Sequence, residues 1–133
     1  MTKRRVFLIL AALWLCFIWG QSFLSADLSR AESGRVLALL QRILPGLTAH
    51  MVRKAAHFTE YAVLGALLFG AFPIRSRAAL TGTLFAAMLA AVTDETIQLF
   101  SAGRSGQITD VWLDFAGAAL GYLAMRLLTH RKE

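Results

Sequence analysis

The sequence predicts an all-α integral membrane protein, a four-helix bundle with an amphipathic interfacial helix between its first and second spans. Composition is the first reason. Hydrophobic residues make up 57% of the 133-residue chain and charged residues only 17%, whereas soluble proteins average about 45–50% and about 25%. The second reason is that four apolar segments are each long enough to cross a bilayer, which takes about 17–25 helical residues. The length predicts one domain over residues 1–133.

The four expected spans cover residues 6–23, 55–72, 78–100 and 108–128. The first contains no charged residue and follows Lys3-Arg4-Arg5, so the alternative is a cleaved signal peptide. Its apolar run is longer than the usual 7–15 residues of a signal peptide, and no clear small-residue cleavage site follows. A retained first span is therefore the favoured interpretation.

The connection between the first two spans predicts one further helix, over about residues 30–44. The run Ser29-Arg30-Ala31-Glu32 has the pattern of a capping box, and Pro45-Gly46 ends the helix. Apolar residues then recur at helical spacing, at Val36, Leu37, Leu40, Ile43 and Leu44. Such a helix either lies on the outer membrane surface or packs over the mouth of the bundle.

The distribution of Lys and Arg predicts the orientation, because cytoplasmic loops carry an excess of them. With the N-terminus in the cytoplasm, the inner side carries Lys3, Arg4, Arg5, Arg75, Arg77, Arg126, Arg131 and Lys132. The outer side carries Arg30, Arg35, Arg42, Arg53, Lys54 and Arg104. We therefore expect a multi-pass protein with both termini in the cytoplasm.

Acidic residues gather at one depth of the expected bundle. Five of the eight lie inside or beside the apolar segments: Glu60, Asp94, Glu95, Asp110 and Asp114. A charge at the membrane centre costs roughly 2.5–3.5 kcal/mol on insertion scales, so such residues indicate a site by default. In the expected topology all five share the outer half of the membrane with His57 and Gln98, and Arg104 lies on the adjoining loop.

Helical spacing places these polar residues on shared faces. The faces are Lys54, His57 and Tyr61, then Asp94 and Gln98, then Asp110, Asp114, Gly117 and Gly121. Glycines four residues apart let a neighbouring helix approach closely in membranes. The face of the last helix therefore both packs and carries carboxylates, which directs these acids into the bundle.

These blocks resemble the VanZ-like family of membrane proteins, the family of a teicoplanin-resistance protein. The resemblance runs from about residue 50 to 125 and is carried by Lys54-x-x-His57-Phe58-x-Glu60-Tyr61, Asp94-Glu95-x-x-Gln98-x-Phe100, Gly103-Arg104, Asp110, Asp114 and Gly117-x-x-x-Gly121. It implies a protein of the bacterial cytoplasmic membrane that acts on the cell envelope, with a link to glycopeptide resistance. Many relatives have Asn at the position of Asp114.

The preferred function is binding and chemical processing of a lipid-linked, phosphate-bearing envelope substrate at the outer leaflet. The expected catalytic residues are His57, Glu60, Asp94 and Glu95, because His titrates near neutrality and carboxylates can orient it or accept a proton. The expected substrate-binding residues are Lys54, Tyr61, Gln98, Arg104, Asp110 and Asp114. The alternatives are a lipid-binding or shielding protein without chemistry and a small transporter or proton relay. A nucleic-acid partner is not expected, because the basic residues are scattered over both membrane faces.

Two questions stay open at the level of sequence. Glu95, Asp110 and Asp114 are ligands of the kind that hard divalent cations prefer, but no recognised metal-ligand spacing is present, so no metal site or other cofactor is predicted. Arg104 either contacts substrate or forms a purely structural ion pair with Asp94 or Glu95.

Overall fold

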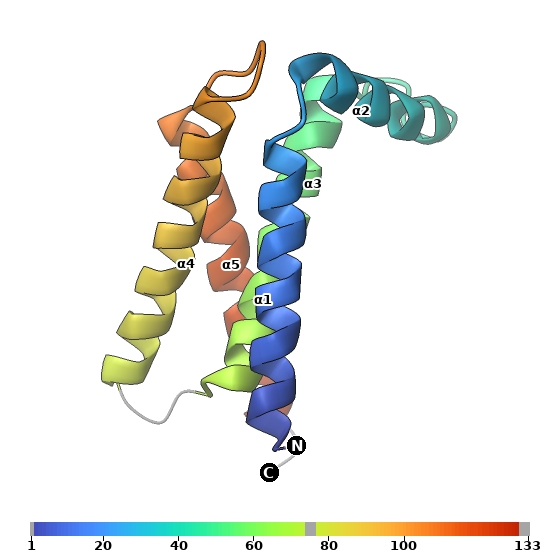
Figure 1. Cartoon of the computed structure of the whole chain (residues 1–133). Coiled ribbons are helices and arrows are strands. Elements are labelled where there is room, and N and C mark those ends of the chain that lie inside the picture. The colour runs from blue at the N-terminus through green and yellow to red at the C-terminus, as the bar shows by residue number, and fades with distance from the viewer. Residues whose placement is uncertain (1, 74–76, 131–133) are drawn as a thin grey trace.

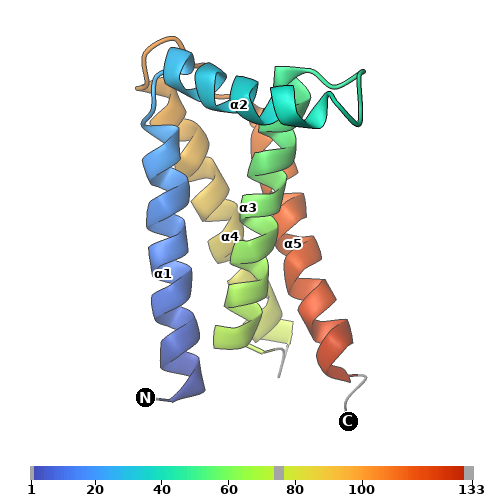
Figure 2. The same cartoon turned by 90° about the vertical axis from the view of Figure 1, so that its right-hand side faces the viewer.

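The computed structural model describes residues 2–73 and 77–130, and these residues form helices without any strand. The helices are α1 (Lys3–Ser22), α2 (Ala26–Leu40), α3 (Ala49–Ala71), α4 (Arg77–Leu99) and α5 (Ile108–His130). The four long helices run side by side, and α2 lies across one end of them, which we call the α2 end (Figures 1 and 2). α1 begins and α5 ends at the opposite end (Figure 1).

The four long helices agree closely with the four expected spans. The largest difference is at α3, which starts earlier, at Ala49, because the side chain of Thr48 caps it by accepting a hydrogen bond from the Met51 N–H at 3.2 Å. Among the described helices, α1, α4 and α5 are long and apolar enough to cross a membrane. α3 is not among them, because its first half contains several charged residues.

The helix between the first two spans exists, but both of its predicted bounds are wrong. It ends at Leu40, ahead of a turn over residues 41–43, whereas residue 44 was the expected end. α2 begins at Ala26, where Ser25 Oγ accepts a hydrogen bond from the Leu28 N–H at 3.5 Å. Ser29, the expected cap, lies inside the helix, and its carbonyl accepts a hydrogen bond from Ser33 Oγ at 2.8 Å. Ser25 prevails because the chain is anchored there, where the Ala26 N–H donates to Ala102 O in the α4–α5 loop at 2.9 Å.

α3 and α5 approach each other through glycines. A Cβ atom at Gly121 would lie 1.8 Å from Ala62 O, and one at Gly117 would lie 2.4 Å from Phe58 O. The close-packing face predicted from these two glycines is thereby confirmed. Gly65 on α3 does the same from the other side, because its Cβ would lie 1.9 Å from the Ala118 carbonyl oxygen on α5.

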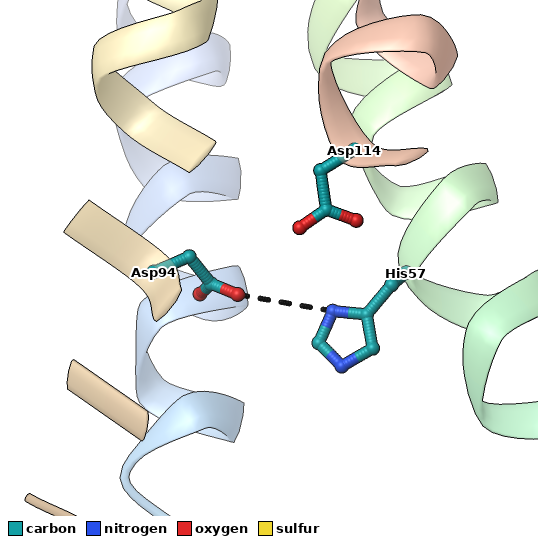
Figure 3. A group of neighbouring side chains, drawn as sticks. All are labelled: His57, Asp94 and Asp114. Carbon is teal, nitrogen blue, oxygen red and sulfur yellow. Dashed lines mark ion pairs between the residues drawn. The ribbon is translucent and has the colours of Figure 1, made fainter. Parts of the chain in front are cut away.

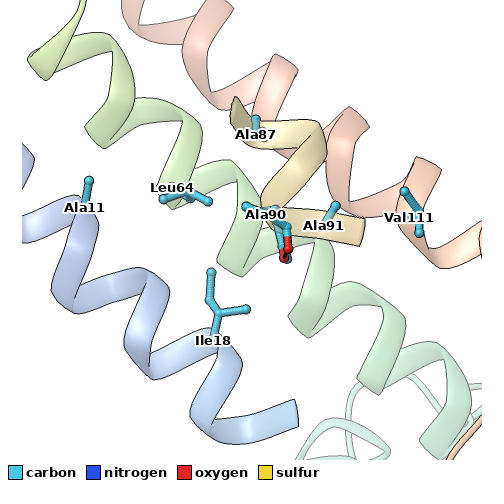
Figure 4. Close-up of a cluster of buried hydrophobic side chains, with 9 residues drawn as sticks. Ala11, Ile18, Leu64, Ala87, Ala90, Ala91 and Val111 are labelled. Atoms are coloured by element: carbon cyan, nitrogen blue, oxygen red, sulfur yellow. Dashed lines mark hydrogen bonds between the residues drawn. The ribbon is translucent and has the colours of Figure 1, made fainter. Parts of the chain in front are cut away.

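The apolar core is built mainly from small side chains (Figure 4). Ile18 of α1 and Ala91 of α4 are completely buried, and Leu64 of α3 is almost fully buried. Large apolar side chains lie instead on the outside of the bundle; Leu13, Phe85 and Leu127 are each more than 60% exposed. An apolar exterior around a core of small residues is the arrangement expected of helices that pack within lipid.

Candidate functional site

Three helices bring polar side chains together in the interior near the α2 end. Asp94 on α4 and Asp114 on α5 are both completely buried. His57 on α3 faces them across the interior (Figure 3). Residues from three distant parts of the sequence thus meet at one depth.

His57 and the two aspartates form a compact group. One ligand atom from each of the three side chains lies within 4.8 Å of the others. His57 Nδ1 is 3.8 Å from Asp94 Oδ2 and 3.9 Å from Glu60 Oε2, distances longer than a hydrogen bond. His57 Nδ1 and both carboxylate oxygens of Asp114 are buried and have no hydrogen-bond partner among the described residues. Most buried polar atoms in proteins are paired, so these three atoms call for an explanation.

Asp94, in contrast, is held by two hydrogen bonds. Ser22 Oγ, at the end of α1, donates to Asp94 Oδ1 at 2.6 Å, and Gln98 Nε2 donates to Oδ2 at 3.1 Å. Ser22 is itself completely buried. Ser22 was not among the expected site residues, although a serine that ends an otherwise apolar span was a usable signal.

We expect Ser22→Ala to lower the free energy of unfolding by about 1–3 kcal/mol, because it leaves a buried carboxylate oxygen without its donor. Thermal or denaturant unfolding of the purified protein in detergent measures this effect. Ser33→Ala is the matched control, because among the described residues the Ser33 hydroxyl bonds only to the preceding turn of α2. Equal unfolding energies for Ser22→Ala and the wild type would contradict the assigned contact.

Gln98 and Arg104 connect this group to the α4–α5 loop. Gln98 Nε2 also donates to Glu95 Oε1 at 3.1 Å, and Gln98 Oε1 accepts from Arg104 Nη2 at 3.0 Å. Arg104 Nη1 donates to Gln21 O at 3.2 Å. The loop reaches this position through Gly103, whose φ of 71° favours glycine.

Arg104 forms no ion pair with any carboxylate in the described part of the chain. The structural Asp94–Arg104 or Glu95–Arg104 pair considered as an alternative is therefore wrong. Glu95 is satisfied instead by Gln98 and by the Gln107 N–H, which donates to Glu95 Oε2 at 2.7 Å. Partial burial lowers the pKa of the Arg104 guanidinium, and the charge of Asp94 opposes this shift. Arg104 still carries its charge, because a guanidinium is not deprotonated in proteins.

A cavity of about 140 Å³ lies between α2, α3 and the α4–α5 loop. Its lining includes Arg53, Lys54, His57, Arg104, Asp110 and Asp114. Lys54 is paired with Asp110. Arg53 makes neither a hydrogen bond nor an ion pair within residues 2–73 and 77–130. Two arginines in this lining, Arg53 and Arg104, thus lack a carboxylate partner.

An apolar groove lies near this cationic cavity, and a second cavity lies between the two. Arg53, His57 and Arg104 also line an adjacent cavity of about 220 Å³ beneath α2. That cavity shares Val36, Val52, Ala56 and Glu60 with a groove of about 530 Å³ between α1, α2 and α3. The rest of the groove is mainly apolar and includes Trp14, Phe17 and Met51. The two guanidinium groups that lack a described carboxylate partner therefore lie beside a mainly apolar groove, with the second cavity between them.

The structure separates the ten expected site residues into three groups. Six line the cationic cavity: Lys54, His57, Gln98, Arg104, Asp110 and Asp114. Glu60 lines the adjacent cavity. Asp94 lines neither cavity, but its Oδ2 atom lies 3.8 Å from His57 Nδ1. Tyr61 and Glu95 do not line the cationic cavity. Tyr61 is completely buried in the core and donates its hydroxyl hydrogen to Ala90 O at 3.1 Å. Arg53 also lines the cationic cavity; from the sequence it was considered beside Lys54 as a further positive charge near a phosphate headgroup, but it was not among the ten expected site residues.

The fold and the site together define a helical membrane protein with a polar, partly cationic site buried at one end of its helices. The chain belongs to the VanZ/LLP1 family, whose model matches residues 7–129. The family resemblance found in the sequence motifs is thereby confirmed. No curated protein and no solved structure was found to match the chain.

Proposed function

We propose that this protein binds a lipid-linked, phosphate-bearing envelope substrate at the outer leaflet of the bacterial cytoplasmic membrane. The observation that supports this most strongly is that the cationic cavity and the apolar groove both adjoin one intermediate cavity and share lining residues with it. A ligand that fills both must have an anionic head and an apolar tail.

The head would occupy the cationic cavity. At about 140 Å³, the cavity is close to the roughly 150 Å³ that accommodates a benzene molecule in an engineered protein, so it suits a phosphate group. Arg53 supplies a guanidinium that no described carboxylate neutralises, and guanidinium groups bind phosphate through paired, charge-assisted hydrogen bonds. The apolar tail would lie in the groove between α1, α2 and α3.

The proposed membrane placement follows from the same arrangement. α3 would cross as a fourth span, because it lies alongside three helices that are apolar enough to do so (Figure 2). α2 would lie in the outer interface, with exposed apolar residues such as Leu28 and Leu39 toward lipid. The cluster of Lys3, Arg4 and Arg5 at the opposite end favours the cytoplasm for that end. The expected orientation also rests on three residues that lie outside the described ones: Arg75, Arg131 and Lys132.

A second candidate is catalysis at the bound headgroup, and the position of His57 favours it. His57 lines the cationic cavity and has Glu60 and Asp94 within 4 Å of its ring nitrogen. It is thus the side chain best placed to exchange a proton with a headgroup, and Glu60 and Asp94 would orient it. An enzyme should lose product formation in His57→Ala while still binding lipid, whereas a shielding protein should tolerate the change.

The proton-relay alternative has less support. Buried charged residues among the described ones are Asp94, Glu95 and Asp114, all near the α2 end. Toward the opposite end the buried polar residue is Thr83, whose hydroxyl bonds to the preceding turn of its own helix. A relay needs ionisable groups through the whole thickness of the membrane.

The proposal is tested by comparing two ligands that differ only in the phosphate. Purified full-length protein in detergent is titrated with a polyprenyl phosphate and with the matching polyprenyl alcohol, and native mass spectrometry counts bound molecules. We expect the phosphate to bind at least tenfold more tightly, because a hydrogen bond to a charged group contributes about 1.5–3 kcal/mol. Equal affinities for the two ligands would rule out headgroup recognition, and the same spectra identify any lipid that co-purifies.

A further inference from the structure

We infer that His57, Asp94 and Asp114 form a binding site for a divalent transition-metal ion such as Zn²⁺. The three side chains come from α3, α4 and α5 and converge in the interior (Figure 3). Asp114 is the key observation, because it is completely buried and neither of its carboxylate oxygens has a partner in the described part of the chain. Its carboxylate points toward the space between His57 and Asp94 (Figure 3).

The spacing suits a metal ion better than direct hydrogen bonds. Zinc binds His nitrogen and carboxylate oxygen at about 2.0–2.2 Å in tetrahedral geometry, which places neighbouring ligand atoms about 3.4 Å apart. His57 Nδ1 and Asp94 Oδ2 are 3.8 Å apart, and all three ligand atoms lie within 4.8 Å of one another. Small side-chain rotations would bring the three atoms onto one ion.

The kinds of ligand point to the same class of ion. Imidazole nitrogen suits zinc and other transition metals, and carboxylates accept the same ions. Two carboxylates also balance the charge of a divalent cation, which removes the cost of burying them unpaired. Three protein ligands leave a fourth position for water or substrate, as in catalytic zinc sites. That position would face the cationic cavity, because His57 and Asp114 both line it.

Hydrogen bonds from surrounding side chains support the arrangement. Metal-binding carboxylates are normally oriented by further hydrogen bonds, and Ser22 and Gln98 orient Asp94 in this way. From the sequence, three carboxylates were considered as ligands for a divalent cation: Glu95, Asp110 and Asp114. Glu95 is already engaged with Gln107, and Asp110 is engaged with Lys54. Of that earlier set, only Asp114 belongs to the group that the structure brings together.

Cobalt binding to the full-length protein tests this site without any lipid ligand. The protein in detergent is stripped with a chelator, desalted and titrated with Co²⁺, and the visible absorption and the bound metal per chain are measured. We expect about one equivalent of Co²⁺ with the spectrum of a tetrahedral site, and competition by Zn²⁺. Asp114→Asn and His57→Ala should each weaken binding by at least tenfold.

Asp27→Asn is the matched control, because it makes the same change at an exposed carboxylate on α2 that pairs with Arg30, away from the three proposed ligands. It should bind cobalt as the wild type does. Absence of stoichiometric cobalt binding in the wild type would overturn the inference. It would indicate that bound protons, and not a metal ion, stabilise the three buried side chains. Equal losses of cobalt binding in Asp27→Asn and Asp114→Asn would overturn it as well. If Asp114→Asn fails to fold, the wild-type stoichiometry and His57→Ala still decide the question. Because no lipid is present, failure of the lipid proposal would leave this result unchanged.

Discussion

Gly121→Ala is expected to destabilise the protein by about 1–3 kcal/mol or more, the usual cost of overpacking a well-packed interior. The added methyl group would lie 1.8 Å from the carbonyl oxygen of Ala62 on α3. The obstacle is backbone, so no side-chain rotation relieves it, and α3 and α5 must move apart. His57 and Asp114 lie on these two helices, so the same substitution should also disturb the site.

Gly82→Ala is the matched control for this prediction. Gly82 lies within α4, and a Cβ atom there would have no neighbour within 4 Å. Alanine should therefore be neutral or slightly stabilising at this position, because glycine inside a helix costs about 0.5–1 kcal/mol relative to alanine. Thermal unfolding of both variants in the same detergent gives the comparison. Similar melting temperatures for Gly121→Ala and the wild type would contradict the close contact of α3 and α5.

Arg53→Gln is expected to weaken binding of a polyprenyl phosphate by about 10- to 100-fold. A hydrogen bond to a charged group contributes about 1.5–3 kcal/mol, and each 1.4 kcal/mol is a factor of ten in affinity. Arg53 is preferable to Arg104 for this test. Arg104 also bonds to Gln21 and Gln98 and so helps to hold the loop, whereas Arg53 makes no hydrogen bond or ion pair with any described residue. Folding should therefore be unaffected, and binding of the matching alcohol should change little.

Arg42→Gln serves as the control for Arg53→Gln. Arg42 is exposed beyond the end of α2 and does not line the cationic cavity. The Arg42→Gln substitution removes the same charge as Arg53→Gln, so any general attraction of the protein surface for anions falls equally in both variants. Equal losses of affinity would favour a shielding protein, in which surface cations on and beyond α2 act together, over a defined headgroup site.

Much of the architecture could be predicted from the sequence. The apolar runs located the four long helices, because the length of an apolar segment depends only on local composition. The spacing of Gly117 and Gly121 identified the face of α5 that packs, since helical periodicity determines which residues share a face. The start of α2 was missed, because Ser25 and Ser29 are both adequate caps and a contact with the distant Ala102 selects the first of them.

The membrane class, the long helices and the layer in which the polar residues gather were thus determined by the sequence alone. Only the tertiary structure decided which polar atoms meet: Ser22 with Asp94, Arg104 with Gln98, and Asp114 with no described partner. The physical reason is that periodicity sets the face a residue occupies on its own helix. The rotation and offset of one helix against the next decide whether two such faces bring their atoms within bonding distance. Those quantities come from packing contacts between residues far apart in the chain, such as Gly121 against Ala62.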